Sequence, residues 1–216
     1  MSELRTDEET VEQIQDWWRE NGTILLVTVV LVFGGVFGWN WWQDQRQAEI
    51  GEASALYLQW MQGREQGESV DELAARLRDQ HPGSPYVALL RFADAAEAVE
   101  AQDAQAAREA LEAVLEMDLT APLHDLARLR LARLDLDAGE PEAVLARLDP
   151  ITGADRIAAA QELRGDALRA LDRPEEARAA YERAMAASSA DRPLLEMKRD
   201  DLGATIAATR TLETTE

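Results

Sequence analysis

An apolar run at residues 23–42 constrains this chain more than any other feature of its sequence. It reads TILLVTVVLVFGGVFGWNWW and contains no charged residue. A helix of this length extends about 30 Å, which is the thickness of the hydrocarbon core of a bilayer. The run therefore predicts a transmembrane helix. A buried core helix is the alternative interpretation, which the length of the run and the aromatic residues at both ends disfavour.

Tryptophans lie on both sides of this run. An indole ring combines an apolar body with one N–H donor, so it favours the level of the lipid headgroups. We predict that five tryptophans mark the two membrane interfaces: Trp17, Trp18, Trp39, Trp41 and Trp42. Within the run, Gly34 and Gly38 have the spacing that lets two membrane helices pack closely. Glycine is common in membrane helices, so this spacing is weaker support for helix packing, and a homo-oligomer stays open.

The residues around the run favour an uncleaved anchor over a signal peptide. A signal peptide has a basic start, an apolar core of about 7–15 residues and small residues at its cleavage site. Here the preceding segment is mostly acidic, the core is longer, and the run ends in Asn-Trp-Trp. The arginines are almost evenly divided between its two flanks. The positive-inside rule therefore leaves the orientation open.

The composition excludes several classes of partner and site. The chain has 42 acidic and 22 basic residues, which gives a net charge of −20, and a surface of this sign repels nucleic acid. It has no cysteine, so disulfides, thiolate metal sites and a cysteine nucleophile are excluded. The two histidines, His81 and His124, are not at metal-ligand spacing. We expect no cofactor and no metal.

The rest of the chain predicts an all-α fold. Alanine- and leucine-rich segments with apolar residues three and four apart alternate with short breaks that contain Gly, Pro or Asp. We expect a loop from Gly63 to Gly67, a helix capped by Ser69, and a further helix with Ser84 as its cap and Pro85 at its first position. The sequence predicts five divisions: an N-terminal segment at residues 1–22, a transmembrane helix at 23–42, a helical connector at 43–84, a repeat domain at 85–208 and a flexible tail at 209–216.

The repeat domain shows a tetratricopeptide-like pattern. In residues 158–189, Gly165, Ala177, Tyr181 and Ala184 occupy places where this repeat has small residues and one large aromatic residue. Small residues let two antiparallel helices approach closely, and the aromatic ring fills the space beside them. Weaker copies lie upstream, with Ala132 and Ala143 in one, and Ala95, Ala107, Leu111 and Val114 in the other. A general alanine- and leucine-rich bundle is the alternative.

An amphipathic segment at residues 191–208 predicts a C-terminal helix that caps the last repeat. We expect its leucines and isoleucine to face inward and its charged residues to face water. The inward set is Leu194, Leu195, Leu202 and Ile206, and the outward set is Lys198, Arg199 and Asp200.

Several stretches together resemble the YfgM family, the ancillary SecYEG translocon subunits. They are Trp17-Trp18 followed by Glu20-Asn21-Gly22, the apolar run that ends in Gly38-Trp39, ARLRLARLDLDAG at 127–139, ELRGDALRALDRPEEARAAYERAM at 162–185 and LLEMKRDDL at 194–202. The resemblance implies a bacterial inner-membrane protein with a cytoplasmic N-terminus and a periplasmic tetratricopeptide-like domain. It also implies association with the Sec translocon and with a membrane-anchored periplasmic chaperone. The low number of basic residues before the span departs from the expected topological signal.

No pattern in the sequence predicts an enzyme, whereas one pattern is compatible with protein binding. Neighbouring acidic residues lie in the first turns of predicted helices, where the helix dipole explains them. Stacked helix pairs present the first helix of each pair on a concave face. There the candidate partner-binding residues are Arg133, Glu162, Asp166 and Arg169. Their pattern is more typical of a solvated polar face than of a peptide groove.

The sequence therefore predicts a non-catalytic, membrane-anchored adaptor that links the Sec protein-export translocon to periplasmic chaperones. The alternative is an oligomeric envelope scaffold that assembles through its transmembrane helix and has no direct role in export.

Overall fold

The computed structural model describes residues 7–154, 156–188 and 192–202, and its regular structure there is helical throughout. The all-α prediction is confirmed. The chain divides into two compact units, residues 1–58 and residues 59–216. The predicted flexible tail at 209–216 lies outside the described residues, as does the end of the predicted repeat domain from residue 203.

Helix α1 (Asp7–Glu65) dominates the first unit and contains the whole apolar run. Large side chains of the run are exposed, including Phe33, Phe37 and Trp41. In the described part of the chain, one helical segment, Leu26–Glu65, is long and apolar enough to cross a membrane, with a mean hydropathy of 1.3 and no buried residues in its apolar window. The helix is therefore a candidate membrane span, and the alternative of a buried core helix is not supported.

The loop that we expected at Gly63–Gly67 is shorter in the structure and begins after Glu65. The helix continues to Glu65, and the chain then turns through Gly67, whose φ of +73° suits glycine. Gly63 is buried, and a Cβ atom there would lie 2.7 Å from Cγ1 of Val70. Gly63 therefore does not end the helix. It allows the returning chain to pack closely against the last turn.

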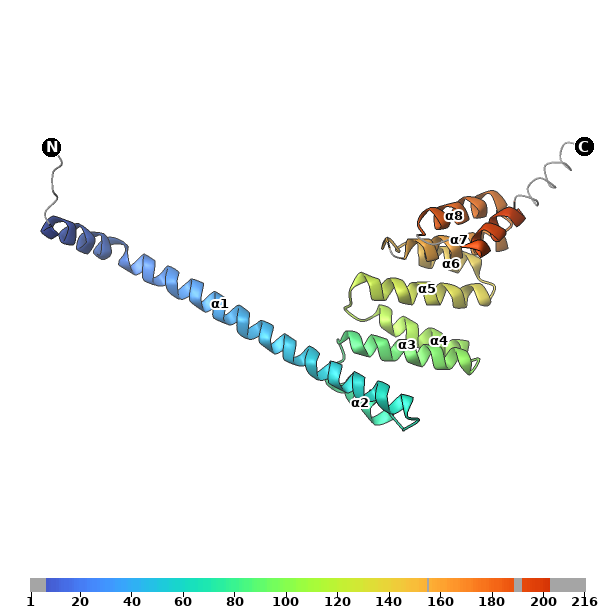
Figure 1. Ribbon diagram of the computed structural model, residues 1–216, viewed down its shortest axis with the longest axis horizontal. Helices are drawn as coiled ribbons and strands as arrows, with labels where there is room; N and C mark the ends of the chain where they lie inside the picture. Colours follow the sequence, from blue (N-terminus) through green and yellow to red (C-terminus); the bar gives the residue numbers. More distant parts are fainter. Residues whose placement is uncertain (1–6, 155, 189–191, 203–216) are drawn as a thin grey trace, which may run out of the picture. The chain divides into compact units, whose positions relative to one another are not determined.

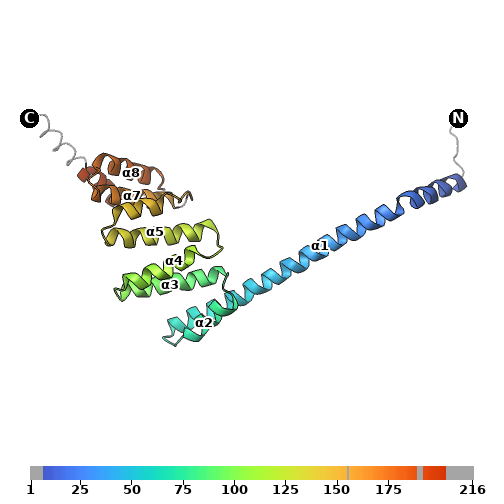
Figure 2. The same cartoon turned by 180° about the vertical axis from the view of Figure 1, so that it is seen from behind.

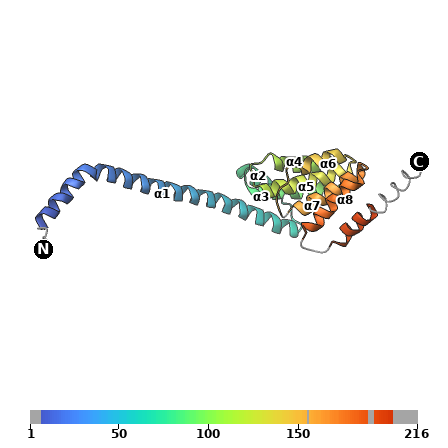
Figure 3. The same ribbon diagram turned by 90° about the horizontal axis from the view of Figure 1, so that it is seen from above.

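In the described part of the second unit, the seven helices α2 to α8 stack in order along the chain (Figures 1 and 2). They are α2 (Asp71–Gln80), α3 (Pro85–Glu100), α4 (Ala104–Leu115), α5 (Ala121–Asp137), α6 (Pro141–Leu148), α7 (Ile157–Ala170) and α8 (Pro174–Ala186). Residues 193–202 are also helical. Figure 3 shows α4 and α6 on one side of the stack, and α3, α5 and α7 on the other. This arrangement of alternating helices is that of a helical-repeat solenoid.

Local capping explains where two of these helices begin. The Ser84 hydroxyl accepts a hydrogen bond from the Tyr86 amide, and Pro85 is the first residue of α3, as predicted. The cap predicted at Ser69 is wrong. The helix begins at Asp71, so Val70 and not Ser69 occupies the cap position, and valine has no polar side chain to serve as a cap. The Ser69 hydroxyl donates to the Asp71 carboxylate at 3.4 Å.

The small residues of the repeats pack as the pattern predicts. Ala177, Tyr181 and Ala184 are fully buried in a cluster between α7, α8 and the C-terminal helix. Gly165 is buried on α7, against the ring of Tyr181. The residues of the weakest predicted copy, Ala95, Ala107, Leu111 and Val114, are all buried as well. The tetratricopeptide-like packing is thus repeated along the stack.

A buried carboxylate also joins three helices of the stack. Asp135 of α5 is completely buried, and both Arg108 of α4 and Arg147 of α6 form ion pairs with it. The hydrogen bond and the negative charge of Asp135 raise the pKa of Arg108, against a smaller opposing effect of burial. The two arginines therefore compensate the cost of burying this charge and tie consecutive repeats together.

We expect Gly165→Ala to destabilise the protein. A Cβ atom at this position would lie 2.4, 2.5 and 2.9 Å from three carbons of the Tyr181 ring. Overpacking of this kind costs about 1–3 kcal/mol, which exceeds the gain of up to about 1 kcal/mol from replacing a helical glycine with alanine. Denaturant unfolding of the full chain in detergent micelles, followed by circular dichroism, measures the change.

Gly83→Ala is the matched control, because a Cβ atom at Gly83 would meet no atom within 4 Å. Equal stability of the Gly165→Ala variant and the wild-type protein would contradict the close packing of α7 on Tyr181.

Candidate protein-binding face

The four predicted face residues lie on two helices of the same layer. Arg133 belongs to α5, whereas Glu162, Asp166 and Arg169 belong to α7. Steps of four and three residues place the α7 side chains along one face of the helix. We call these four residues the α5–α7 face.

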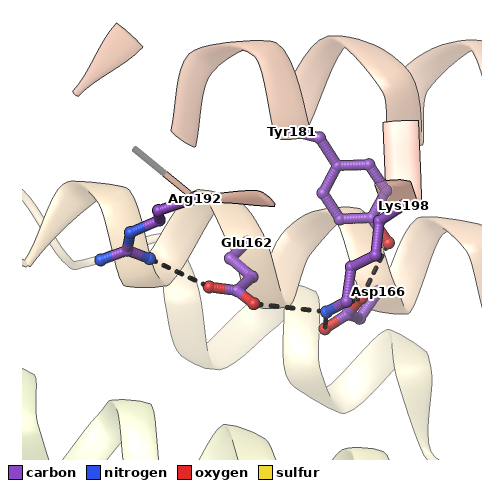
Figure 4. A network of polar contacts seen from close by, with 5 residues as sticks. All are labelled: Glu162, Asp166, Tyr181, Arg192 and Lys198. Atoms are coloured by element: carbon purple, nitrogen blue, oxygen red, sulfur yellow. Dashed lines mark hydrogen bonds and ion pairs between the residues drawn. The ribbon is translucent and has the colours of Figure 1, made fainter. Parts of the chain in front are cut away.

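The structure brings Glu162 and Asp166 together around a single cation. The Lys198 ammonium lies 3.3 Å from Glu162 Oε1 and 2.8 Å from each carboxylate oxygen of Asp166. Arg192 donates to the other oxygen of Glu162 at 3.1 Å (Figure 4). Both cations come from the C-terminal segment of the same chain. The two carboxylates are therefore neutralised within the protein.

The inward position of Lys198 corrects the prediction for the C-terminal helix. Its side chain is only 18% exposed, whereas we expected it to face water. Leu195 and Leu202 are buried as predicted. Lys198 lies three residues after the first and four before the second, so it shares their face of the helix. Burying both leucines therefore turns Lys198 inward. The spacing of Leu195, Lys198 and Leu202 in the sequence could have predicted this position.

Leu194 lies on another side of this helix. It is 55% exposed, so its predicted inward position is wrong. The difference has the same cause, because a helix that buries Leu195 and Leu202 turns the residue before Leu195 about 100° away. Ile206 lies outside the described residues.

Tyr181 completes the polar network at its buried end. The Tyr181 hydroxyl donates to Asp166 Oδ1 at 2.7 Å, and the Lys198 ammonium lies 5.8 Å from the centre of its ring. Burial raises the pKa of Tyr181, and the hydrogen bond to the Asp166 carboxylate raises it further. One residue thus combines the repeat's aromatic packing with a polar contact to the α5–α7 face. The aromatic pattern predicted the ring but not its hydroxyl partner.

A hollow of about 320 Å³ lies beside this network. Arg169 and Lys198 supply positive charge to it, and Asp166 supplies negative charge. Leu136 of α5 and Ala170 of α7 supply apolar surface. The hollow is open and small, so it can receive side chains of a bound segment rather than enclose a small molecule.

The predicted membrane residues lie on α1. The five tryptophans are exposed, with ring centres of Trp39 and Trp42 5.2 Å apart. A Cβ atom at Gly34 or Gly38 would meet no atom within 4 Å. Contacts with lipid or with another helix at these residues therefore stay predictions.

The described residues contain no group of three or more His, Asp or Glu side chains that could hold a metal ion. His124 contacts a backbone carbonyl, that of Met117, at 3.0 Å, and lies in the first turn of α5. What the face can do chemically is pair charges and accept side chains.

These features define a tetratricopeptide-like protein with a long apolar N-terminal helix. The model of a family described as tetratricopeptide repeat-like domain matches residues 15–204. The chain therefore belongs to this family, and its relatives carry the name that the sequence resemblance predicted.

Three relatives are each named ancillary SecYEG translocon subunit. The Haemophilus influenzae protein is 27% identical over 74% of this chain and 79% of its own length. The Escherichia coli protein is 26% identical over 84% of this chain and 88% of its own length. The Neisseria gonorrhoeae protein is 26% identical over 91% of this chain and 97% of its own length. No solved structure matches the chain.

We expect the stability of the protein to fall at alkaline pH partly through Tyr181. Because its pKa in the folded protein is raised above the ordinary value of 10.0, the unfolded chain loses this proton first. The contribution of the Tyr181 hydroxyl to the free energy of unfolding is therefore complete below about pH 10 and decreases as the pH rises further. Tyr181→Phe should cost about 1 kcal/mol at neutral pH through the lost hydrogen bond and should show a flatter decline between about pH 9 and 11.

Denaturant unfolding at a series of pH values measures how the free energy of unfolding declines with pH in the wild-type protein and in the Tyr181→Phe variant. An equal decline in the variant and the wild-type protein would contradict a buried, hydrogen-bonded hydroxyl.

Proposed function

We propose that the protein is a membrane-anchored, non-catalytic adaptor of the Sec protein-export translocon. In this proposal α1 crosses the bacterial inner membrane, with residues 1–22 in the cytoplasm and the repeat unit in the periplasm. The repeat unit binds a membrane-anchored periplasmic chaperone and holds it near emerging chains. The shared name of the relatives is the observation that carries the proposal.

The two units of the chain support this role in different ways. An exposed apolar helix is stable in lipid, whereas exposing the same side chains to water is unfavourable. Helical-repeat solenoids present extended surfaces that bind other polypeptides. A tether raises the effective concentration of the repeat unit beside membrane-bound partners, so weak contacts are sufficient for association.

Site-specific photocrosslinking in living cells tests the two contacts separately. We expect a photoreactive residue at Gly38 to capture translocon subunits and one at Ala170 to capture a periplasmic chaperone. Ala170 is a better position than Asp166, because it is exposed and lines the hollow whereas Asp166 belongs to the internal network. Gln80, exposed at the end of α2, is the control position. Products containing neither kind of partner would refute the adaptor role.

A reporter that is active only in the periplasm tests the proposed orientation. Fused after Thr209, it should be active, and a matched reporter active only in the cytoplasm should be silent. The reverse result would place the repeat unit in the cytoplasm and exclude a periplasmic chaperone as its partner.

The scaffold alternative rests on the glycines of α1. The open space around Gly34 and Gly38 would allow a second helix to approach closely. Replacing both with isoleucine should abolish the function of a scaffold that assembles through this helix. An adaptor should keep the chaperone crosslinks of its repeat unit in the same variant.

A further inference from the structure

The charges of the α5–α7 face divide into two groups. The carboxylates of Glu162 and Asp166 are neutralised by Lys198 and Arg192. In the described part of the chain, the guanidinium groups of Arg133 and Arg169 form no hydrogen bond and no ion pair. Both arginines are exposed, and they lie on two helices of the same layer, α5 and α7.

Arg169 has no ion-pair partner among the described residues, although a carboxylate lies one turn away. Asp166 precedes it by three residues, a spacing that favours an ion pair on a helix. The oxygens of Asp166 instead accept from Lys198 and Tyr181. Arg169 is exposed at the edge of the hollow and is available to another anion.

Arg133 has a cation rather than an anion as its charged neighbour. Arg130 lies one turn earlier, with its guanidinium 4.7 Å from the centre of the Phe92 ring. Burial lowers the pKa of Arg130, and the positive charge of Arg133 lowers it further. Asp137 follows Arg133 by four residues, but no ion pair joins them in the described structure. Among the described residues, Arg133 is therefore available to an external anion.

Apolar surface lies between the two unpaired arginines. Leu136 follows Arg133 by one turn on α5, and both Leu136 and Ala170 line the hollow that Arg169 borders. A bound segment could place carboxylates on the arginines and an apolar side chain in the hollow. Guanidinium groups pair with carboxylates in two-pronged hydrogen bonds, which suits such a segment better than an isolated charge.

We propose that the α5–α7 face binds an acidic, leucine-containing segment of a polypeptide partner through Arg133 and Arg169. This proposal rests on the partner-binding role proposed above and specifies the chemistry of the partner. The net charge of −20 repels an acidic segment from most of the surface, and the α5–α7 face offers two exposed arginines beside an apolar hollow. The affinity should decrease with added salt.

Fluorescence anisotropy with the full chain in neutral-detergent micelles tests the proposal. The probes are three fluorescein-labelled 12-residue peptides with four repeats of Glu-Glu-Leu, Gln-Gln-Leu or Lys-Lys-Leu. The Glu probe should bind about fivefold or more tightly than the Gln probe, as expected for two charge-assisted pairs at an exposed site. The double variant Arg133→Gln/Arg169→Gln should remove this difference.

The double variant Arg76→Gln/Arg183→Gln is the matched control. These two arginines are also exposed and form no ion pair in the described residues, so their replacement changes the net charge equally. The control should retain the preference for the Glu probe. Equal affinity for the Glu and Gln probes, tighter binding of the Lys probe, or an equal loss in the control would overturn the proposal.

The peptide and crosslinking results are independent of each other. A preference for the Glu probe without translocon or chaperone crosslinks would retain this site and refute the adaptor role. Crosslinks without a preference for the Glu probe would retain the adaptor role and refute the acidic-segment site.

Discussion

The contact between Gly165 and the ring of Tyr181 is the interaction on which the candidate site depends. It holds α7 and α8 so close that no other side chain fits between them at this point. The same ring carries the hydroxyl that donates to Asp166, and Asp166 in turn accepts from Lys198 of the C-terminal helix. Packing and electrostatics at the end of the solenoid are therefore coupled through one aromatic residue.

Charges are compensated differently in the interior of the repeat unit and on the α5–α7 face. In the interior, Asp135 is buried between Arg108 and Arg147, and removing one partner of such a pair typically costs about 3–5 kcal/mol. On the α5–α7 face, the C-terminal segment neutralises the carboxylates, whereas Arg133 and Arg169 form no ion pair with any residue that the structure describes. An acidic chain thus presents a local cationic surface without changing its overall charge.

Much of the fold could be predicted because it follows from local rules. The apolar run specified a long helix, Ser84 and Pro85 specified the start of α3, and the repeat pattern identified Gly165 and Tyr181 as packing partners. The continuation of α1 past Gly63 was not predicted, because glycine usually indicates a break, whereas here its missing side chain leaves room for Val70. The cap predicted at Ser69 is wrong because α2 begins one residue later, which places Val70 at the cap position.

The sequence by itself determined the class of this protein. Helical periodicity, an uncharged apolar run and a repeat of small and aromatic residues are local or regularly spaced signals, and each has one dominant structural solution. Only the tertiary structure decided which charges of the α5–α7 face are free. Lys198 and Arg192 are more than twenty-five residues from the carboxylates they contact, and that pairing depends on how the C-terminal helix turns when Leu195 and Leu202 become buried.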